Sequence, residues 1–148
     1  LELLVVVAIL GILSGIAGVA SGVSGEQQLD MAELQIRDAL AWAQAQARSN
    51  RSAAAVVFDA GQDRFALVDA DGAALSDPVT QSAYVVSFRR PNQPRLVDLL
   101  DAAFGAAGRA AIFDAQGLPL TGGTITLQAL GTTRTLTLDP ATGALSAP

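Results

Sequence analysis

The sequence has no cysteine, no histidine and no lysine, and these absences remove most catalytic and metal-binding templates. A chain without Cys and His has no Ser-His-Asp triad, no Cys-His pair, no thiolate zinc site and no imidazole ligand. No disulfide can stabilise the fold, so its stability must come from packing. We therefore expect no enzymatic activity, no metal and no cofactor.

Aromatic and basic residues are also scarce. Fourteen acidic residues face nine basic ones, all arginine, and the net charge is −5. Nucleic-acid binding depends on a basic surface, so nucleic acid is not the expected partner. With only 5% aromatic residues, we expect a core of Val, Leu, Ile and Ala. The larger core side chains are then Phe58, Phe65, Phe88, Phe104 and Phe113.

What the sequence does have is a long apolar start. From Leu1 to Ala20 the only charged residue is Glu2, and with Val23 included the stretch reaches the roughly 20 apolar residues that span a bilayer core. A secretory signal peptide would carry a basic start and a small-residue cleavage site, which this run lacks. An unrelated membrane anchor has no reason to place Glu2 inside its apolar edge, where a carboxylate costs roughly 2.5–3.5 kcal/mol unless it is paired.

Glycines recur along this segment at spacings of 4, 3, 4 and 3 residues, which places them on one stripe of a helix. Such a stripe lets another backbone approach closely. Each interior glycine also costs roughly 0.5–1 kcal/mol relative to alanine, so the segment Gly15–Gly25 is where we expect a helix to thin, bend or melt. The stripe consists of Gly11, Gly15, Gly18, Gly22 and Gly25.

Beyond Gly25 the pattern becomes amphipathic. Apolar residues recur at helical spacing from Leu29 to Ala47, which predicts that the same helix continues to about Arg48 with one face packed on a sheet. We divide the chain into a helix that spans a membrane or is buried in an equally apolar place (residues 1–25), its amphipathic continuation (26–50) and a β-rich head domain (51–148). The fold class is α+β, with a long N-terminal helix packed on an antiparallel β-sheet domain.

The head domain reads as strands separated by turns. Residues 92–108 show no clear pattern, and either a short helix or a loop with one pair of strand residues fits them. The sequence Asp69-Ala70-Asp71-Gly72 closes one strand as a turn. The expected strands are Ala53–Asp59, Arg64–Val68, Tyr84–Arg90, Ala110–Phe113, Thr124–Leu130 and Thr133–Leu138.

The first residues, L-E-L-L-V-V-V-A-I-L-G-I-L, resemble the N-terminal helix of type IV pilins and type II secretion pseudopilins. The C-terminal half is similar to minor pseudopilin H and the FimT-like minor pilins, although Asp69–Ala110 has no counterpart. This similarity rests on Ala47–Asn50, Ala111–Gly117, Gly123–Leu127, Arg134–Leu138 and Gly143. The resemblance implies a pilin-like fold and a chain that has lost its leader and about three residues of its mature, methylated start.

The resemblance also implies a function. The protein is expected to anchor in the bacterial inner membrane with its head in the periplasm, and to assemble with identical or related subunits into a type IV pilus or type II secretion pseudopilus. Glu2 then pairs with the N-terminal amine of the adjacent subunit, while Gly11, Gly15, Gly18 and Gly22 allow close packing. A simpler role for Glu2 is that of a surface-seeking residue at the membrane rim. The same resemblance also fits a principal subunit of an extended surface filament, or a DNA-binding minor pilin.

Three further candidate sites are weaker. Asp69 and Asp71 lack the additional oxygen ligands of a calcium loop. The arginine concentration in the middle of the head (Arg89, Arg90, Arg95, Arg109) sits in an acidic protein, and only Arg134 lies where FimT-like pilins carry DNA-binding arginines. The pairs Asp98 with Asp101 and Asp59 with Asp63 have no nucleophile or metal ligand beside them. We therefore assign no catalytic, metal-binding or nucleic-acid-binding residue.

Overall fold

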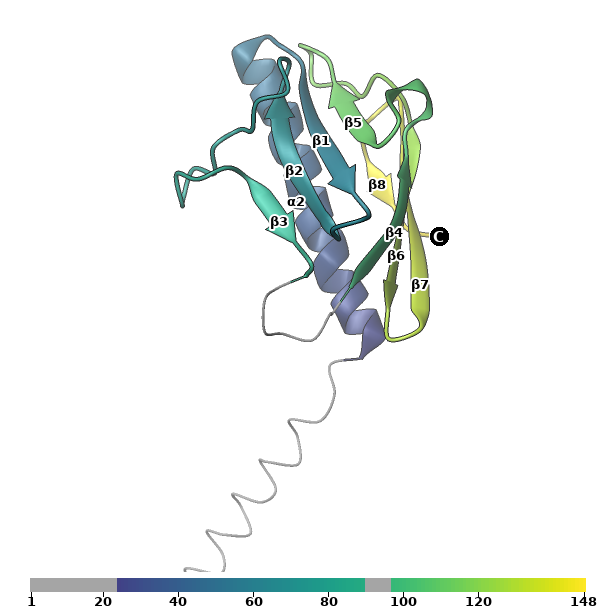
Figure 1. Ribbon diagram of the computed structural model, residues 1–148. Coiled ribbons are helices and arrows are strands. Elements are labelled where there is room, and N and C mark those ends of the chain that lie inside the picture. The colour runs from purple at the N-terminus through teal and green to yellow at the C-terminus, as the bar shows by residue number, and fades with distance from the viewer. Residues whose placement is uncertain (1–23, 90–96) are drawn as a thin grey trace, which may run out of the picture.

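The computed structural model describes residues 24–89 and 97–148, which form one helix packed on two antiparallel sheets (Figure 1). Within these residues, no helix is long and apolar enough to cross a membrane. Nearly all of the expected membrane segment lies outside the described residues, as do Glu2, Gly11, Gly15, Gly18 and Gly22.

The described helix is α2 (Gly25–Asn50), and it has its own start and end. Ser24, with φ −69° and ψ 157°, is extended and is the N-cap of α2, and its carbonyl accepts the first helical hydrogen bond from the Gln28 N–H at 3.1 Å. Helix α2 therefore has its own start within the segment Gly15–Gly25, where we expect a helix to thin, bend or melt, and residues 15–23 of that segment lie outside the described residues. At the other end Arg51 adopts a left-handed conformation, and the helix runs two residues beyond the expected Arg48.

The strands divide into two four-stranded sheets rather than one (Figure 1). The first has the order β3-β2-β1-β5 and the second β4-β6-β7-β8, and all pairings are antiparallel. The strands are β1 (Ala54–Asp59), β2 (Arg64–Asp69), β3 (Val85–Ser87), β4 (Asp98–Ala103), β5 (Ala110–Phe113), β6 (Gly123–Ala129), β7 (Thr132–Leu138) and β8 (Leu145–Ser146). A 3₁₀ turn, η1 (Gly105–Ala107), separates β4 from β5.

Helix α2 joins the two sheets into one core, because it contacts β1 and β5 of the first and β6 and β7 of the second. Its buried side chains fall on one face at helical spacing, from Leu29 through Ile36 and Leu40 to Ala47. All five phenylalanines are buried, as expected from the sequence. The ring of Phe58 in β1 stacks on that of Phe104, which follows β4, with centroids 5.6 Å apart. This aromatic contact connects the two sheets.

Residues 98–103, within the segment where we expected a short helix or a loop, form the six-residue strand β4 instead, whereas residues 92–96 lie outside the described residues. Strand β4 pairs with β6 and contains a bulge between Leu99 and Asp101. The bulge changes which face each residue occupies, so Val97, Leu99 and Ala102 all point inward although their spacing is two and then three. The strand expected at Tyr84–Arg90 is shorter, spanning Val85–Ser87, and β8 has no counterpart among the expected strands.

Candidate assembly surface at the base of the head domain

The end of the head domain at which α2 begins is called the base here. It comprises residues 24–33 of α2 and its cap, Arg134 of β7, and the turn between β6 and β7 at Leu130 and Gly131. Figure 1 shows that the start of α2 and this turn lie at the same end of the molecule.

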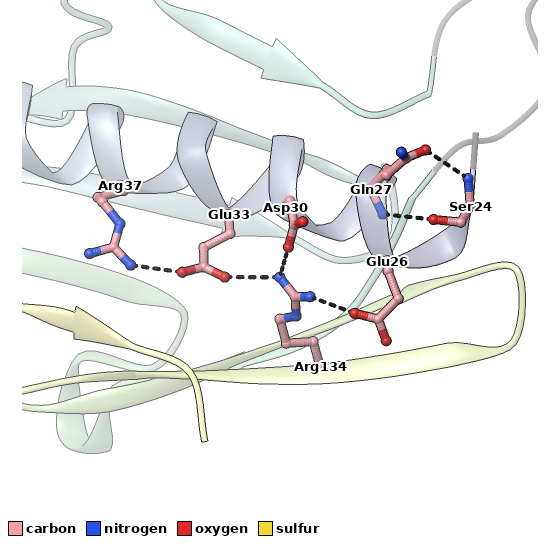
Figure 2. A network of polar contacts seen from close by, with 7 residues as sticks. All are labelled: Ser24, Glu26, Gln27, Asp30, Glu33, Arg37 and Arg134. Carbon is pink, nitrogen blue, oxygen red and sulfur yellow. Dashed lines mark hydrogen bonds and ion pairs between the residues drawn. The ribbon is translucent and has the colours of Figure 1, made fainter.

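A capping box fixes the start of α2 (Figure 2). The Ser24 hydroxyl accepts a hydrogen bond from the Gln27 backbone N–H at 3.3 Å, and the Gln27 side chain accepts one from the Ser24 N–H at 3.2 Å. These bonds satisfy two donors that helix geometry leaves without partners at an N-terminus. The chain therefore enters α2 at a defined residue, directly after the apolar stretch that ends at Val23.

Arg134 holds the first two turns of α2 against β7 (Figure 2). Its guanidinium donates to Asp30 at 2.6 Å, to Glu33 at 3.0 Å and to Glu26 at 3.2 Å. The three acidic residues lie at spacings of four and three, so they share one edge of the helix. One arginine thus bonds three carboxylates that come from a segment about a hundred residues earlier in the chain.

The contact combines a sheltered centre with an exposed rim. The side chains of Arg134 and Glu33 are each 17% exposed, whereas those of Glu26 and Asp30 are 70% and 67% exposed. The hydrogen bond to Asp30 and then that to Glu33 raise the pKa of the Arg134 guanidinium, against the opposing effect of burial. Arg37 extends the network by donating to the other oxygen of Glu33 at 2.7 Å. Together the five side chains carry three negative and two positive charges.

Gly25, the last glycine of the expected stripe, does permit a close backbone approach. A Cβ placed there would lie 2.5 Å from the carbonyl oxygen of Ala129 and 3.4 Å from the Cβ of Leu130. The approaching backbone belongs to the β6–β7 turn of the same chain, not to a second molecule. The β6–β7 turn is therefore packed directly against the first residue of α2.

A second polar contact joins the two sheets. Asp63, in the turn between β1 and β2, is only 3% exposed and adopts a positive φ of 48°. Its carboxylate accepts a hydrogen bond from the Leu99 N–H of β4 at 3.1 Å and pairs with Arg89 at 3.0 Å, while its carbonyl accepts from the Phe88 N–H. Asp63 thus connects the first sheet to the bulged strand of the second.

The other sequence candidates take structural positions. One oxygen of Asp69 accepts hydrogen bonds from the Asp71 and Ala73 N–H groups, and Gly72 has a φ of 81°, so this segment is the expected turn. Asp59 pairs with Arg64 and accepts from the Gln62 N–H. Asp98 and Asp101 both lie in β4, on opposite sides of its bulge.

The arginines considered for DNA contact are likewise placed, where the structure describes them. Arg89 pairs with Asp63, and the carbonyl of Arg109 accepts a hydrogen bond from the Phe58 N–H. Arg90 and Arg95 lie outside the described residues. The charge of Arg134 is directed at three carboxylates of its own chain, which disfavours a phosphate in the same place.

The sequence carried a partial signal for this surface. Glu26, Asp30 and Glu33, followed by Arg37, repeat at helical spacing along one edge of α2. This largely acidic edge indicates a basic partner on a neighbouring element. Nothing local identifies Arg134 as that partner. The β6–β7 turn carried a second signal, since Leu130 stands where two-residue hairpin turns usually have Asn or Gly.

Comparison with known proteins assigns the fold. The type IV minor pilin FimU of Pseudomonas aeruginosa strain PAO1 superposes with a TM-score of 0.55 at 20% identity, over 83% of this chain and 90% of the other. The minor pseudopilin EpsH from the type 2 secretion system of Vibrio cholerae superposes with a TM-score of 0.59 at 14% identity, over 80% and 94%. No protein-family model and no curated protein sequence matches. The chain has the pilin-like α+β fold shared by minor pilins and minor pseudopilins.

Proposed function

We propose that this protein is a structural subunit of the pilin type. Its apolar N-terminal segment anchors it in the bacterial inner membrane, and the same segment later packs against identical or related subunits in a type IV pilus or type II secretion pseudopilus. The head domain occupies the periplasm before assembly and the filament surface afterwards. Its role is structural and not catalytic.

The observation that carries this proposal is the pilin-like fold at the end of an apolar segment with a single acidic residue. In the sequence, the apolar segment directly precedes α2, the helix that packs on both sheets. The outer face of α2 adds support. Met31 and Leu34 are 64% and 58% exposed there, as expected for a helix whose outer face meets neighbouring subunits.

Glu2 is the proposed assembly residue. A carboxylate that leaves water needs a cation within hydrogen-bond range, and an N-terminal amine of an adjacent subunit supplies one. Loss of such a partner leaves an uncompensated charge, at a cost of roughly 3–5 kcal/mol per subunit contact. The glycines at 11, 15, 18 and 22 are proposed to let the helices of neighbouring subunits approach closely.

The test is the yield of sheared filaments from cells that express either the wild-type chain or Glu2→Ala. We expect the variant to fold and to fractionate with the membrane, but to be depleted from filaments. Leu3→Ala is the matched control, because it removes apolar volume next to Glu2 while leaving the charge in place. An unchanged filament yield for Glu2→Ala contradicts the assignment. Counting subunits in purified filaments separates a minor subunit from the principal subunit of an extended filament.

A further inference from the structure

The β6–β7 turn has an unusual residue at its tip. Ala129 pairs with Thr132, so Leu130 and Gly131 form a two-residue hairpin loop. Both have positive φ angles, 48° and 83°, as in a type I′ turn. Asn-Gly, Asp-Gly and Gly-Gly are the usual sequences for this turn, because a branched apolar side chain is strained at positive φ. Leucine is thus disfavoured at position 130 by the local backbone conformation.

The apolar side chain of Leu130 is also exposed to water. It is 72% exposed, second only to Val79 among the large exposed apolar residues of the described chain. A strained conformation that persists together with solvent exposure points to a role outside the folding of the head domain. The question is what covers this side chain.

The location of the turn indicates the answer. Gly25 lies against the Ala129 carbonyl and the Leu130 Cβ, and only Ser24 separates Gly25 from the apolar stretch ending at Val23. Two residue steps span at most about 7 Å. The polar interfacial layer on each side of a bilayer's hydrocarbon core is about 5–8 Å thick. If the apolar stretch spans the membrane, as proposed above, the tip of the β6–β7 turn lies at the boundary between headgroups and hydrocarbon.

We infer that Leu130 inserts into the lipid interface and seats the base of the head domain on the membrane before assembly. This inference rests on the proposed membrane anchor and adds to it a second, shallow contact. The contact is apolar and not electrostatic, because the neighbouring Glu26 and Asp30 are acidic and exposed. Anionic lipids therefore do not strengthen it, in contrast to contacts made by polybasic segments.

The absence of cysteine makes the full chain suitable for single-site labelling. We would place an environment-sensitive fluorophore at Leu130→Cys in proteoliposomes of phosphatidylcholine, with or without lipid brominated near the headgroup end of its acyl chains. Ile12→Cys reports whether the apolar segment inserts. Val79→Cys is the matched control, since the Val79 side chain is 87% exposed. Val79 belongs to the connection between β2 and β3, which projects from the head domain on the side away from the β6–β7 turn (Figure 1).

The inference predicts quenching by brominated lipid at positions 12 and 130 and none at position 79, with no increase when part of the lipid is replaced by phosphatidylglycerol. Quenching at position 12 alone would overturn the seating of Leu130 and leave the membrane anchor standing. Quenching at neither 12 nor 130 would overturn both. Quenching at 130 that appears only with anionic lipid would also overturn the apolar contact.

Leu130→Asn separates this role from folding. Asn-Gly is a favoured type I′ sequence, so the variant should keep or raise the melting temperature of the head, by up to about 5 °C. With a label at the exposed Thr133, two residues beyond the turn, quenching by brominated lipid should fall in Leu130→Asn relative to the unsubstituted turn. Unchanged quenching at Thr133 would show that Leu130 does not hold the turn in the lipid.

Discussion

Removal of the Arg134 guanidinium should destabilise the protein in a salt-dependent manner. Arg134→Ala deletes three charge-assisted hydrogen bonds between β7 and the first turns of α2. The bonds to Glu26 and Asp30 involve carboxylates about two-thirds exposed, so each contributes at most about 0.2–1 kcal/mol. The bond to Glu33 is sheltered on both sides and contributes more, about 1–2 kcal/mol.

These values set the expected loss at about 2 kcal/mol, and not at the larger cost of a buried charge without a partner. Glu33 retains its bond to Arg37 in the variant, so its carboxylate is not left unpaired. For a domain of this size, about 2 kcal/mol corresponds to a fall in melting temperature of roughly 5–10 °C. Arg134→Lys keeps the charge but cannot reach three carboxylates with one planar fork, so about half of the loss should remain.

The assay is thermal and urea unfolding of the full chain in detergent, followed through the fluorescence of Trp42, the single tryptophan. Arg37→Ala is the matched control. It removes a 2.7 Å bond to the same Glu33, but within one helix face, and should cost only about 0.3–0.5 kcal/mol. At 1 M salt, where the screening length is about 3 Å, the difference between wild type and Arg134→Ala should shrink by roughly half.

A double substitution with Glu33→Gln measures the central pair separately, and the two changes should couple by about 1 kcal/mol. If the free energy of unfolding of Arg134→Ala lies within about 0.5 kcal/mol of wild type, a margin typical of a neutral surface change, the ion pairs between β7 and α2 do not stabilise the fold. Equal losses at low and high salt would show that Arg134 acts through packing of its side-chain stem instead of through charge.

Three further predictions concern other parts of the head domain. Asp63→Ala should lower the free energy of unfolding by about 2–4 kcal/mol, and Asp63→Asn should lower it by less, because the amide oxygen still accepts a hydrogen bond from the Leu99 N–H. Equal losses of the two variants in urea melts would exclude this hydrogen bond as the cause. Gly25→Ala should cost about 1–3 kcal/mol through its 2.5 Å approach to the Ala129 carbonyl, whereas Gly61→Ala, with only the Asp59 carboxylate at 3.4 Å, should change the melting temperature little. Burial, and then the negative charges of Asp77 and Asp38, raise the pKa of Tyr84 above 10.0. The stability that this neutral tyrosine contributes is therefore present below pH 10 and declines as pH rises through the folded-state pKa. The absorbance of the single tyrosinate at alkaline pH tests this, and Tyr84→Phe should remove that part of the decline.

Local sequence patterns predicted the elements that are determined by residues close together in the sequence. The face of α2 from Leu29 to Ala47 follows from helical spacing, and the β1–β2 and β6–β7 hairpins follow from short turns between β-branched and aromatic runs. Ser24 had the cap signature, because Gln27 stands three residues after it. That signature marks a helix start inside the segment Gly15–Gly25, where the glycines predict that a helix thins, bends or melts.

Long-range features were not predictable in the same way. The bulge in β4 breaks the two-residue alternation, so Val97, Leu99 and Ala102 do not read as one strand face until β6 is in place. The division into two sheets depends on how β4 and β5 pair on either side of η1, with strands far away in sequence. Arg134 joins Glu26, Asp30 and Glu33 only after the second sheet has packed on α2.

The central claim is that this chain is a polymer subunit and not a solitary membrane protein. The most direct test is to express the full chain together with a pilus or pseudopilus assembly system, shear the cells, and assay the filament fraction for this subunit by immunoblot and by electron microscopy with a labelled antibody. The account predicts that the subunit is in the filaments and that Glu2→Ala stays with the membrane. Recovery of the wild-type chain from the membrane alone, with filaments present but free of it, would contradict the account.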